Sequence, residues 1–365
     1  MQRPIACDRR RFVQIMGSTL LFSAFADRLS WATSQSSAKF AYIGTAENIH
    51  AYAIATDGRF IPQQTMASPY PVAMAIGKDN LYVVNGISDY GNLPRGSVEA
   101  YAIASNGHLK LQSRVPLSLS ATAPRDLTIS PDGRTLVVAV HGGGAYNVLP
   151  IHADGGLGRV SGILKETGSG PHVSQTSAQP SAVMFDRVGR VLAADRGSDR
   201  LSVLSLDNGS LSVTSRCEVN AGSGPGSLLL HPNGRQLYAA HALSGSISSF
   251  GYDATKGRIL DRRQDVKASA ATARAALAVH PSGEMLYSTH GDGVQVWKID
   301  ADGCLQLFSA VEDISPNRLH VTSDGTSLFV LTGDALLRMQ LDAVHAPIAP
   351  IDVASVSNPL SFVSL

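Results

Sequence analysis

Arginines and histidines stand beside short apolar runs at comparable points of a repeated sequence unit. The residues that could do chemistry there are Arg125, Arg196, Arg274, Arg318, His141, His241 and His290. Arginine presents a planar fork of donors that suits carboxylate or phosphate oxygens. Histidine can act as a general base near neutral pH. If the fold gathers these side chains, they predict a site for a small anionic molecule.

The apolar runs belong to a unit of about 45–55 residues, the period of a four-stranded propeller blade. Its clearest copy, residues 121–158, holds the runs Leu127–Ile129, Leu136–Val140 and Tyr146–Ile151 between Pro- and Gly-containing turns. Such short runs of Val, Ile and Leu predict antiparallel strands. Similar units start at Val183, Leu228, Leu277 and Leu319. The sequence therefore predicts an all-β fold, a seven-bladed β-propeller.

The two ends of the chain are expected to share one blade. Phe40–Gly44, Asn48–Ile54 and Phe60–Thr65 predict three strands, with no innermost strand before them. Leu360–Val363 is predicted to supply that strand, which closes the ring and removes free sheet edges. Residues 345–358 are expected to be the return path. The propeller would span residues 39–365, with blades two, five, six and seven starting near Pro71, Pro225, Ala273 and Pro316.

Residues 1–32 carry the pattern of a twin-arginine export signal. Paired arginines in Asp8–Gln14 precede a modest apolar run, Ile15–Ala26, and small residues suited to cleavage follow. The alternative is a basic helix that is retained. Residues 33–38 form a polar spacer, and the predicted location is the periplasm or the exterior. Cleavage would remove Cys7 and leave Cys217 and Cys304, expected to be unpaired and to lie just past the third strands of two blades.

Composition limits the kinds of molecule that the protein is expected to bind. The formal charge is +1 and only 16% of residues are charged, which argues against a broad nucleic-acid footprint and a polybasic membrane patch. Nothing after residue 35 is long and apolar enough to span a bilayer. The expected protein is a monomer that needs no cofactor, binds a small anionic molecule, and contacts neither nucleic acid nor, after signal removal, a membrane.

A propeller brings two kinds of loop to one mouth: the loop before each innermost strand and the turn after each second strand. At this mouth we predict His241 and His290 as catalytic bases. The predicted substrate-binding residues are Asn85, Arg125, His141, Arg196, Arg274 and Arg318. In the alternative interpretation the arginines tie blades together through Asp126, Asp195 and Asp334, and the histidines cap backbone groups. No metal site is predicted, because three imidazoles from separate blades seldom converge.

Several stretches resemble the seven-bladed lactonase family, which includes propeller-type 6-phosphogluconolactonases and carboxymuconate-lactonizing enzymes. They are PDGRTLVVAVHGGGAYNVLPIHADGGLG, GSGPGSLLLHPNGRQLYAAHALSGSISSFGYD and LAVHPSGEMLY. The resemblance runs from about Lys39 to Leu365 and implies a propeller that opens a sugar-derived or other anionic lactone.

The polar positions that this family uses are changed here. Its His-x-His before the fourth blade reads Gln179-Pro180-Ser181, and its Gly-Pro-Arg-His in the fifth reads Gly224-Pro225-Gly226-Ser227. Its Asn-Glu-Leu reads His241-Ala242-Leu243, and its Asn-Arg-Gly reads Thr289-His290-Gly291. Three hypotheses stay open: a lactone hydrolase with a rebuilt site, an inactive propeller that binds an anion or a protein partner, and a metal-dependent redox propeller.

Overall fold

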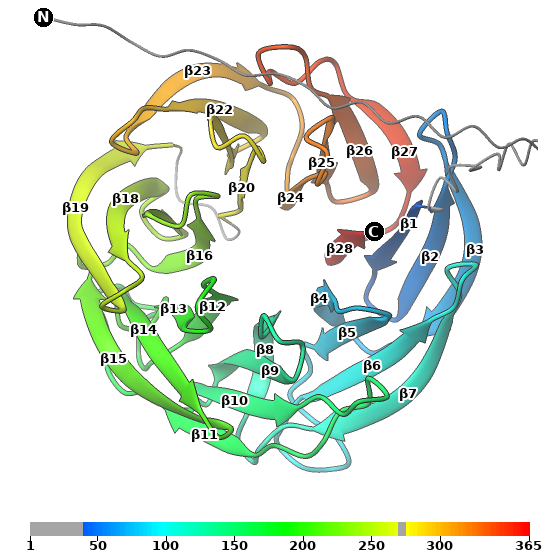
Figure 1. Cartoon of the computed structure of the whole chain (residues 1–365), viewed down its shortest axis with the longest axis vertical. Helices are drawn as coiled ribbons and strands as arrows, with labels where there is room; N and C mark the ends of the chain where they lie inside the picture. Colours follow the sequence, from blue (N-terminus) through cyan, green and yellow to red (C-terminus); the bar gives the residue numbers. More distant parts are fainter. Residues whose placement is uncertain (1–38, 269–274) are drawn as a thin grey trace, which may run out of the picture. The chain divides into compact units, whose positions relative to one another are not determined.

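The computed structural model describes residues 39–268 and 275–365, which form seven four-stranded antiparallel sheets arranged as the blades of a ring (Figure 1). The predicted seven-bladed β-propeller is confirmed. No helix in the described ranges is long and apolar enough to cross a membrane. The predicted export signal, the spacer and Arg274 lie outside the described residues.

Each blade uses its strands in chain order from the centre outward, except the first. The innermost strands are β28 (Ser361–Ser364), β4 (Pro71–Ile76), β8 (Thr122–Ile129), β12 (Pro180–Phe185), β16 (Pro225–Leu230), β20 (Leu277–Val279) and β24 (Arg318–Val321). The second strands are β1 (Lys39–Gly44), β5 (Asn80–Asn85), β9 (Thr135–Gly142), β13 (Val191–Asp195), β17 (Gln236–His241), β21 (Met285–His290) and β25 (Ser327–Leu331).

Outside the second strands, each blade has a third strand that is more buried than the outermost one. The third strands are β2 (Asn48–Ile54), β6 (Ser97–Ile103), β10 (Ala145–Pro150), β14 (Arg200–Asp207), β18 (Ser246–Asp253), β22 (Gly293–Ile299) and β26 (Ala335–Gln340). The outermost are β3 (Phe60–Ala67), β7 (Leu109–Pro116), β11 (Gly162–Lys165), β15 (Ser210–Glu218), β19 (Arg258–Lys267), β23 (Leu305–Val311) and β27 (Ile351–Ser355).

The core of the described chain consists of separate apolar clusters, one at each junction between neighbouring blades. Second strands carry apolar residues on both faces: β5, for example, is buried along its whole length. Outermost strands alternate, because one face contacts the neighbouring blade and the other meets water. Burial between blades is therefore what holds each innermost strand, and any side chain on it, in place.

A hydrogen bond from a tyrosine hydroxyl to a backbone carbonyl of the next blade, hereafter the tyrosine clasp, recurs at several of these junctions. Tyr42, on the second strand of blade one, donates its hydroxyl to the carbonyl oxygen of Gly107 in the outer turn of blade two (3.0 Å). Tyr82 and Tyr238 make the same bond to the following blade. Gly107 has φ +81°, and a Cβ there would lie 2.2 Å from the Phe40 ring, so this turn requires glycine.

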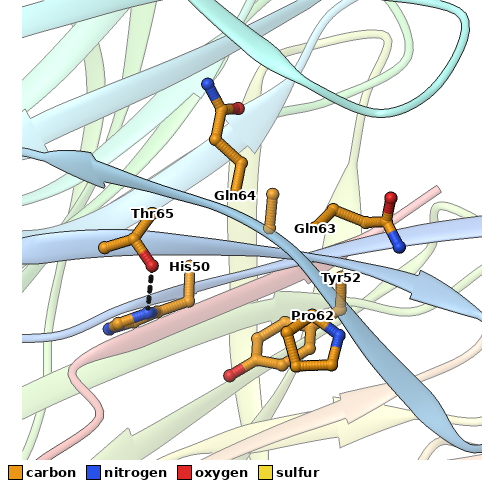
Figure 2. A pocket seen from close by; sticks show the side chains of 7 residues that line it. His50, Tyr52, Pro62, Gln63, Gln64 and Thr65 are labelled. Carbon is orange, nitrogen blue, oxygen red and sulfur yellow. Dashed lines mark hydrogen bonds between the residues drawn. The ribbon is translucent and has the colours of Figure 1, made fainter.

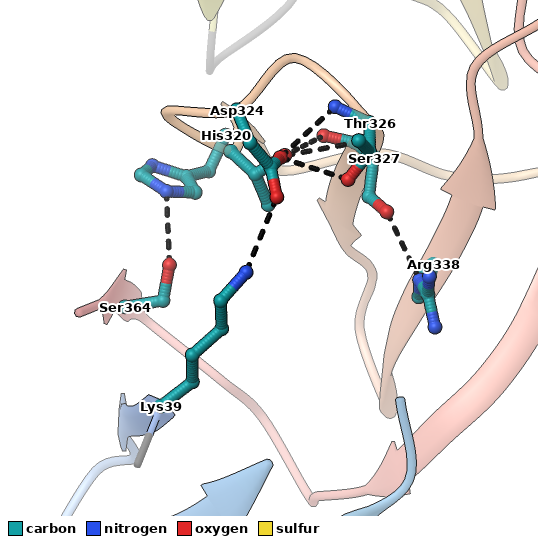
Figure 3. A network of polar contacts seen from close by, with 8 residues as sticks. Lys39, His320, Asp324, Thr326, Ser327, Arg338 and Ser364 are labelled. Atoms are coloured by element: carbon teal, nitrogen blue, oxygen red, sulfur yellow. Dashed lines mark hydrogen bonds and ion pairs between the residues drawn. The ribbon is translucent and has the colours of Figure 1, made fainter. Parts of the chain in front are cut away.

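The ring closes as predicted, because β28 pairs antiparallel with β1 in the order β28-β1-β2-β3. Figure 3 shows two polar links beside this closure. The Lys39 ammonium lies 3.2 Å from the Asp324 carboxylate, and Ser364 Oγ lies 3.2 Å from His320 Nε2. They join the first blade to the seventh.

Three details differ from the sequence-based expectation. Residues 345–358 are not simply a return path, because β27 within them is the outermost strand of blade seven. Blade six has its innermost strand at Leu277, a few residues later than expected. Cys217 lies within an outermost strand rather than past a third one, although it and Cys304 are both unpaired, as predicted.

Candidate functional site

The two predicted kinds of loop do meet at one mouth of the ring. In blade four the backbone N–H of Arg196, after the second strand, donates to the carbonyl of Gln179, before the innermost strand (3.0 Å). In blade five Ala242 N donates to Gly224 O in the same way (2.8 Å). Residues from both loops are thereby fixed next to one another at the top of each innermost strand.

A β-bulge recurs where four innermost strands begin at this mouth. In β4, β8, β12 and β16 the pairing with the second strand skips one residue directly after a proline. Proline has no N–H for the ladder, so the irregularity falls where a hydrogen bond is already missing. The extra residues are Val72, Arg125, Ser181 and Gly226.

The bulge in β8 decides which way Arg125 points. Leu127 packs into the apolar cluster between blades two and three, whereas the Asp126 carboxylate reaches Val183 of blade four. Strict alternation would send Arg125 toward blade two, with Leu127. A bulge re-aims side chains, and Arg125 instead acts electrostatically on groups at the junction of blades three and four.

Arg125, His141 and Arg196 form a cluster at that junction, hereafter the cationic cluster. His141 is the last residue but one of the second strand of blade three, beside the bulge, and Arg196 follows the second strand of blade four. Burial and the two guanidinium groups lower the pKa of His141 to about 4, so the imidazole is neutral at neutral pH. Burial and Arg125 also lower the pKa of Arg196.

The positive charge of this cluster is not compensated by acidic side chains. Arg196 donates only to neutral groups, Gln179 Oε1 at 2.8 Å and Ser174 Oγ at 3.4 Å. Arg125 is exposed and has no hydrogen bond or ion pair to any described residue. Guanidinium groups that lack a carboxylate partner can donate to an anion, or to an oxygen that gains negative charge during a reaction.

His241, a predicted base, lies inside blade five and only 1% of it is exposed. Its Nε2 lies 2.7 Å from Ser248 Oγ, and that hydroxyl donates to Asp265. Since the hydroxyl has a single proton, His241 must be the donor to Ser248, which leaves Nδ1 buried and without a partner. Burial lowers the pKa of His241 to about 4. A ligand at the mouth does not reach this imidazole.

His290, the other predicted base, belongs to the rim. Its Nε2 lies 3.9 Å from Glu312, which follows the outermost strand of blade six. The structure does not bring it to the cationic cluster.

Two other predicted binding residues, Asn85 and Arg318, make hydrogen bonds within and between blades. Asn85 is fully buried; its amide nitrogen donates to Ser68 Oγ (3.0 Å) and Glu99, and its oxygen accepts from Ser97. Arg318 donates to the carbonyls of Leu360 (3.0 Å) and Val72 (2.9 Å) and so links the inner walls of blades seven, one and two.

Asp126, which the sequence predicts as a tie between blades, makes a contact of that kind with blade four. It is half-buried on β8, and its Oδ2 accepts a hydrogen bond from Val183 N (2.9 Å). Burial raises its pKa to about 6, against the attraction of Arg318. The sequence shows only that Asp126 is adjacent to Arg125. Its raised pKa depends on its contact with β12 of the next blade.

A hollow on blade one, lined by His50, Tyr52 and residues of β3, lies on the outer strands and not at the mouth (Figure 2). Its one titratable imidazole bonds Thr65 Oγ1 at 3.1 Å, and no charged side chain lines it. Within residues 39–268 and 275–365, no group of three or more His, Cys, Asp and Glu side chains is arranged to hold a metal ion.

Comparison with known proteins places the fold among lactonases. The sequence profile of the family described as "Lactonase, 7-bladed beta-propeller" matches residues 33–335. The 6-phosphogluconolactonase of Bacillus subtilis is 24% identical over 225 residues, which cover 59% of this chain and 63% of that one. The Klebsiella pneumoniae 6-phosphogluconolactonase is 26% identical over 59% of this chain and 61% of its own. The chain thus spans less than two thirds of these curated relatives.

Solved structures share the whole ring. A putative 6-phosphogluconolactonase from Bacteroides fragilis superimposes with a TM-score of 0.81 at 23% identity, covering 91% of this chain and 99% of that one. The periplasmic gluconolactonase of Pseudomonas aeruginosa gives a TM-score of 0.80 at 23% identity, with 90% and 99% covered. At these identities the likeness shows the fold alone.

Proposed function

The chain belongs to the lactonase family of seven-bladed β-propellers, and we propose that it hydrolyses a sugar-derived lactone at the cationic cluster. The observation that carries the proposal is the convergence of Arg125, His141 and Arg196 without a neutralising carboxylate. The names of the relatives support the substrate class.

Lactone opening needs groups that stabilise the charge of the tetrahedral intermediate. Water adds to the carbonyl carbon, the carbonyl oxygen becomes an oxyanion, and the ring C–O bond then breaks to give a hydroxy acid. Arg125 and Arg196 would donate to that oxyanion, and neutral His141 can add an N–H donor. The product ionises to a carboxylate and releases one proton, which the same guanidinium groups would attract.

The proposed location is the periplasm. Its supports are the twin-arginine pattern at Arg9–Arg11 and the word "periplasmic" in the name of the Pseudomonas relative. An exported enzyme would not meet a phosphorylated sugar lactone made in the cytoplasm, so an unphosphorylated aldonolactone is the favoured substrate.

An anion-binding propeller without hydrolysis is the second candidate. Ser181 and Gly226 favour it, because the residues that the lactonase family places at these bulges carry larger polar side chains. Hydrolysis followed by proton release on glucono-1,5-lactone and 6-phosphogluconolactone separates the two. Turnover that falls at least tenfold in Arg125→Gln, but not in Arg134→Gln at the opposite mouth, supports the hydrolase. Binding of gluconate without any turnover would support the second candidate.

A further inference from the structure

We propose that Gln175 is a positioning residue of this site: it fixes the loop that holds the Arg196 guanidinium, so that Arg196 points where the oxyanion forms. The proposal rests on the proposed hydrolytic function. It names the residue through which the fold sets the direction of one of the two guanidinium groups.

Arg196 is held by the loop that enters blade four, through both its guanidinium and its backbone. Residues 170–179, hereafter the cradle loop, lie between the outermost strand of blade three and β12. Nη1 of Arg196 donates to Gln179 Oε1 at 2.8 Å, and Nη2 donates to Ser174 Oγ at 3.4 Å. The backbone N–H of Arg196 donates to Gln179 O, and its carbonyl accepts from Gln175 Nε2 at 2.7 Å. The direction of this guanidinium therefore depends on the shape of the cradle loop.

Gln175 lies at the centre of the cradle loop, and only 1% of it is exposed. Its amide nitrogen donates to Arg196 O at 2.7 Å and to Asp199 Oδ1 at 2.8 Å. Its amide oxygen accepts from His172 N at 3.1 Å, and its backbone carbonyl accepts from Gly170 N at 3.1 Å. Among uncharged side chains, only an amide offers two N–H donors together with an acceptor. Glutamine is therefore matched to this position.

Asp199 anchors Gln175 to the turn of blade four and to the entry of blade five. It is buried and adopts a left-handed φ of 51°. Its carboxylate also accepts from Gly222 N at 2.6 Å and Gly224 N at 2.7 Å. A Cβ on Gly170 would lie 2.8 Å from Asp199 Oδ2, so the cradle loop passes as close to this carboxylate as a glycine allows. Asp199 is thus the fixed point against which Gln175 sets the loop.

This arrangement orients a guanidinium without cancelling its charge. A carboxylate partner would also hold Arg196, but it would compete with an anionic ligand for the same donors. Gln179 and Ser174 are neutral, and the lowered pKa of Arg196 is that of a guanidinium without a carboxylate partner. A donor that stabilises a transition state must already point to where the charge develops. Gln175 supplies this preorganisation.

The test is a double-mutant cycle of Gln175→Met and Arg196→Gln, measured by lactone hydrolysis. Methionine has a similar length but cannot donate to Arg196 O or to Asp199. If Gln175 acts through Arg196, Gln175→Met should lower kcat about tenfold or more in the wild type, with KM little changed. In the Arg196→Gln background the same change should lower kcat by less than about twofold.

Gln264→Met is the matched control. Gln264 lies on the outermost strand of blade five, where its amide donates to Leu305 O at 3.1 Å and accepts from Leu305 N at 2.7 Å. Its replacement removes the same kinds of hydrogen bond away from the mouth. We expect Gln264→Met to leave kcat unchanged.

A second readout does not depend on hydrolysis. The Arg196 guanidinium contributes to the lowered pKa of His141. Release of Arg196 in Gln175→Met should therefore raise the pKa of His141, which NMR titration of the imidazole measures. Gln264→Met should titrate like the wild type.

Equal losses of kcat in the two backgrounds would overturn the proposal, although the hydrolase would stand. If the wild type opens no lactone, the proposed function fails, and the His141 titration alone then decides whether Gln175 positions Arg196: a raised pKa supports it and an unchanged pKa rejects it. If Gln175→Met does not fold, hydrogen exchange of the Gln175 side-chain amide in the wild type decides instead. Protection of both amide hydrogens supports the proposal, and exchange as fast as that of an exposed glutamine rejects it.

Discussion

Replacing Asp126 with Asn should make the protein more stable at neutral pH. Burial raises the pKa of this carboxyl from 3.8 to about 6, which means that the folded state favours the protonated form. Between those two pH values the folded chain binds more protons than the unfolded chain. Stability therefore falls as pH rises through this window. The wild type loses this contribution above pH 6, whereas Asn, being neutral, does not.

The magnitude follows from the shift. A rise of about 2 pKa units, at 1.36 kcal/mol per unit, corresponds to up to about 3 kcal/mol. The stability difference is the free energy of unfolding of Asp126→Asn minus that of wild type. We expect this difference to be up to about 3 kcal/mol larger at pH 7.5 than at pH 4. Because the two proteins share all other titrating groups, the contributions of those groups cancel in the difference.

The assay is urea unfolding of both proteins at pH 4 and pH 7.5, followed by circular dichroism. Asp132→Asn serves as the control, because the Ser130 hydroxyl and a backbone N–H lower the pKa of Asp132, so its replacement should have the opposite sign. A pH-independent difference between Asp126→Asn and wild type would refute the claim that burial outweighs the hydrogen bond from Val183 N and the attraction of Arg318 at this carboxylate.

Other predictions concern the cluster, the scaffold and the rim. Arg125→Gln should raise the pKa of His141 from about 4 toward its ordinary value, measured by NMR titration of the imidazole, with no change in Arg134→Gln. Tyr238→Phe leaves the Gly303 carbonyl without its 3.1 Å bond and should lower the free energy of unfolding by about 1 kcal/mol, with hydrolysis unchanged; equal stability would contradict the clasp. Deleting residues 361–365 removes β28 and exposes β1, so a soluble, protease-resistant product would contradict the closure. His290→Gln should keep kcat/KM within threefold, and a tenfold loss would return His290 to the site.

The fold was predictable because its signals are local and repeat. Turn residues between Val- and Leu-rich runs mark each blade, and the missing innermost strand of blade one predicted the pairing of β28 with β1. The strand β27 was missed because Ile351–Ser355 is short, follows prolines and is largely exposed, so it lacks the apolar pattern of the inner strands.

The site was predictable as a region but not residue by residue. Sequence places Arg125, His141 and Arg196 near one mouth. Their convergence depends on a bulge in β8, and a one-residue irregularity of pairing is not visible in the sequence. The burial of His241 depends on Ser248 and Asp265, which reach it only through the register of blade five. The sequence around a histidine near the end of a second strand therefore does not show whether its side chain faces the mouth or the interior.

The raised pKa of Asp126 could not be predicted from the sequence either, because it depends on the neighbouring blade. Its partner Val183 is 57 residues away, and its burial comes from the packing of β8 against β12. A pattern of residue types along β8 carries no information about either.

The most direct measurement is proton release during hydrolysis of glucono-1,5-lactone by the purified protein, compared with Arg125→Gln/Arg196→Gln. If the cationic cluster is the hydrolytic site, the wild type and Arg134→Gln should turn over the lactone well above the spontaneous rate. The turnover rate of the double variant should then be at least a hundredfold lower. Full activity of the double variant, with wild-type folding by circular dichroism, would contradict that claim.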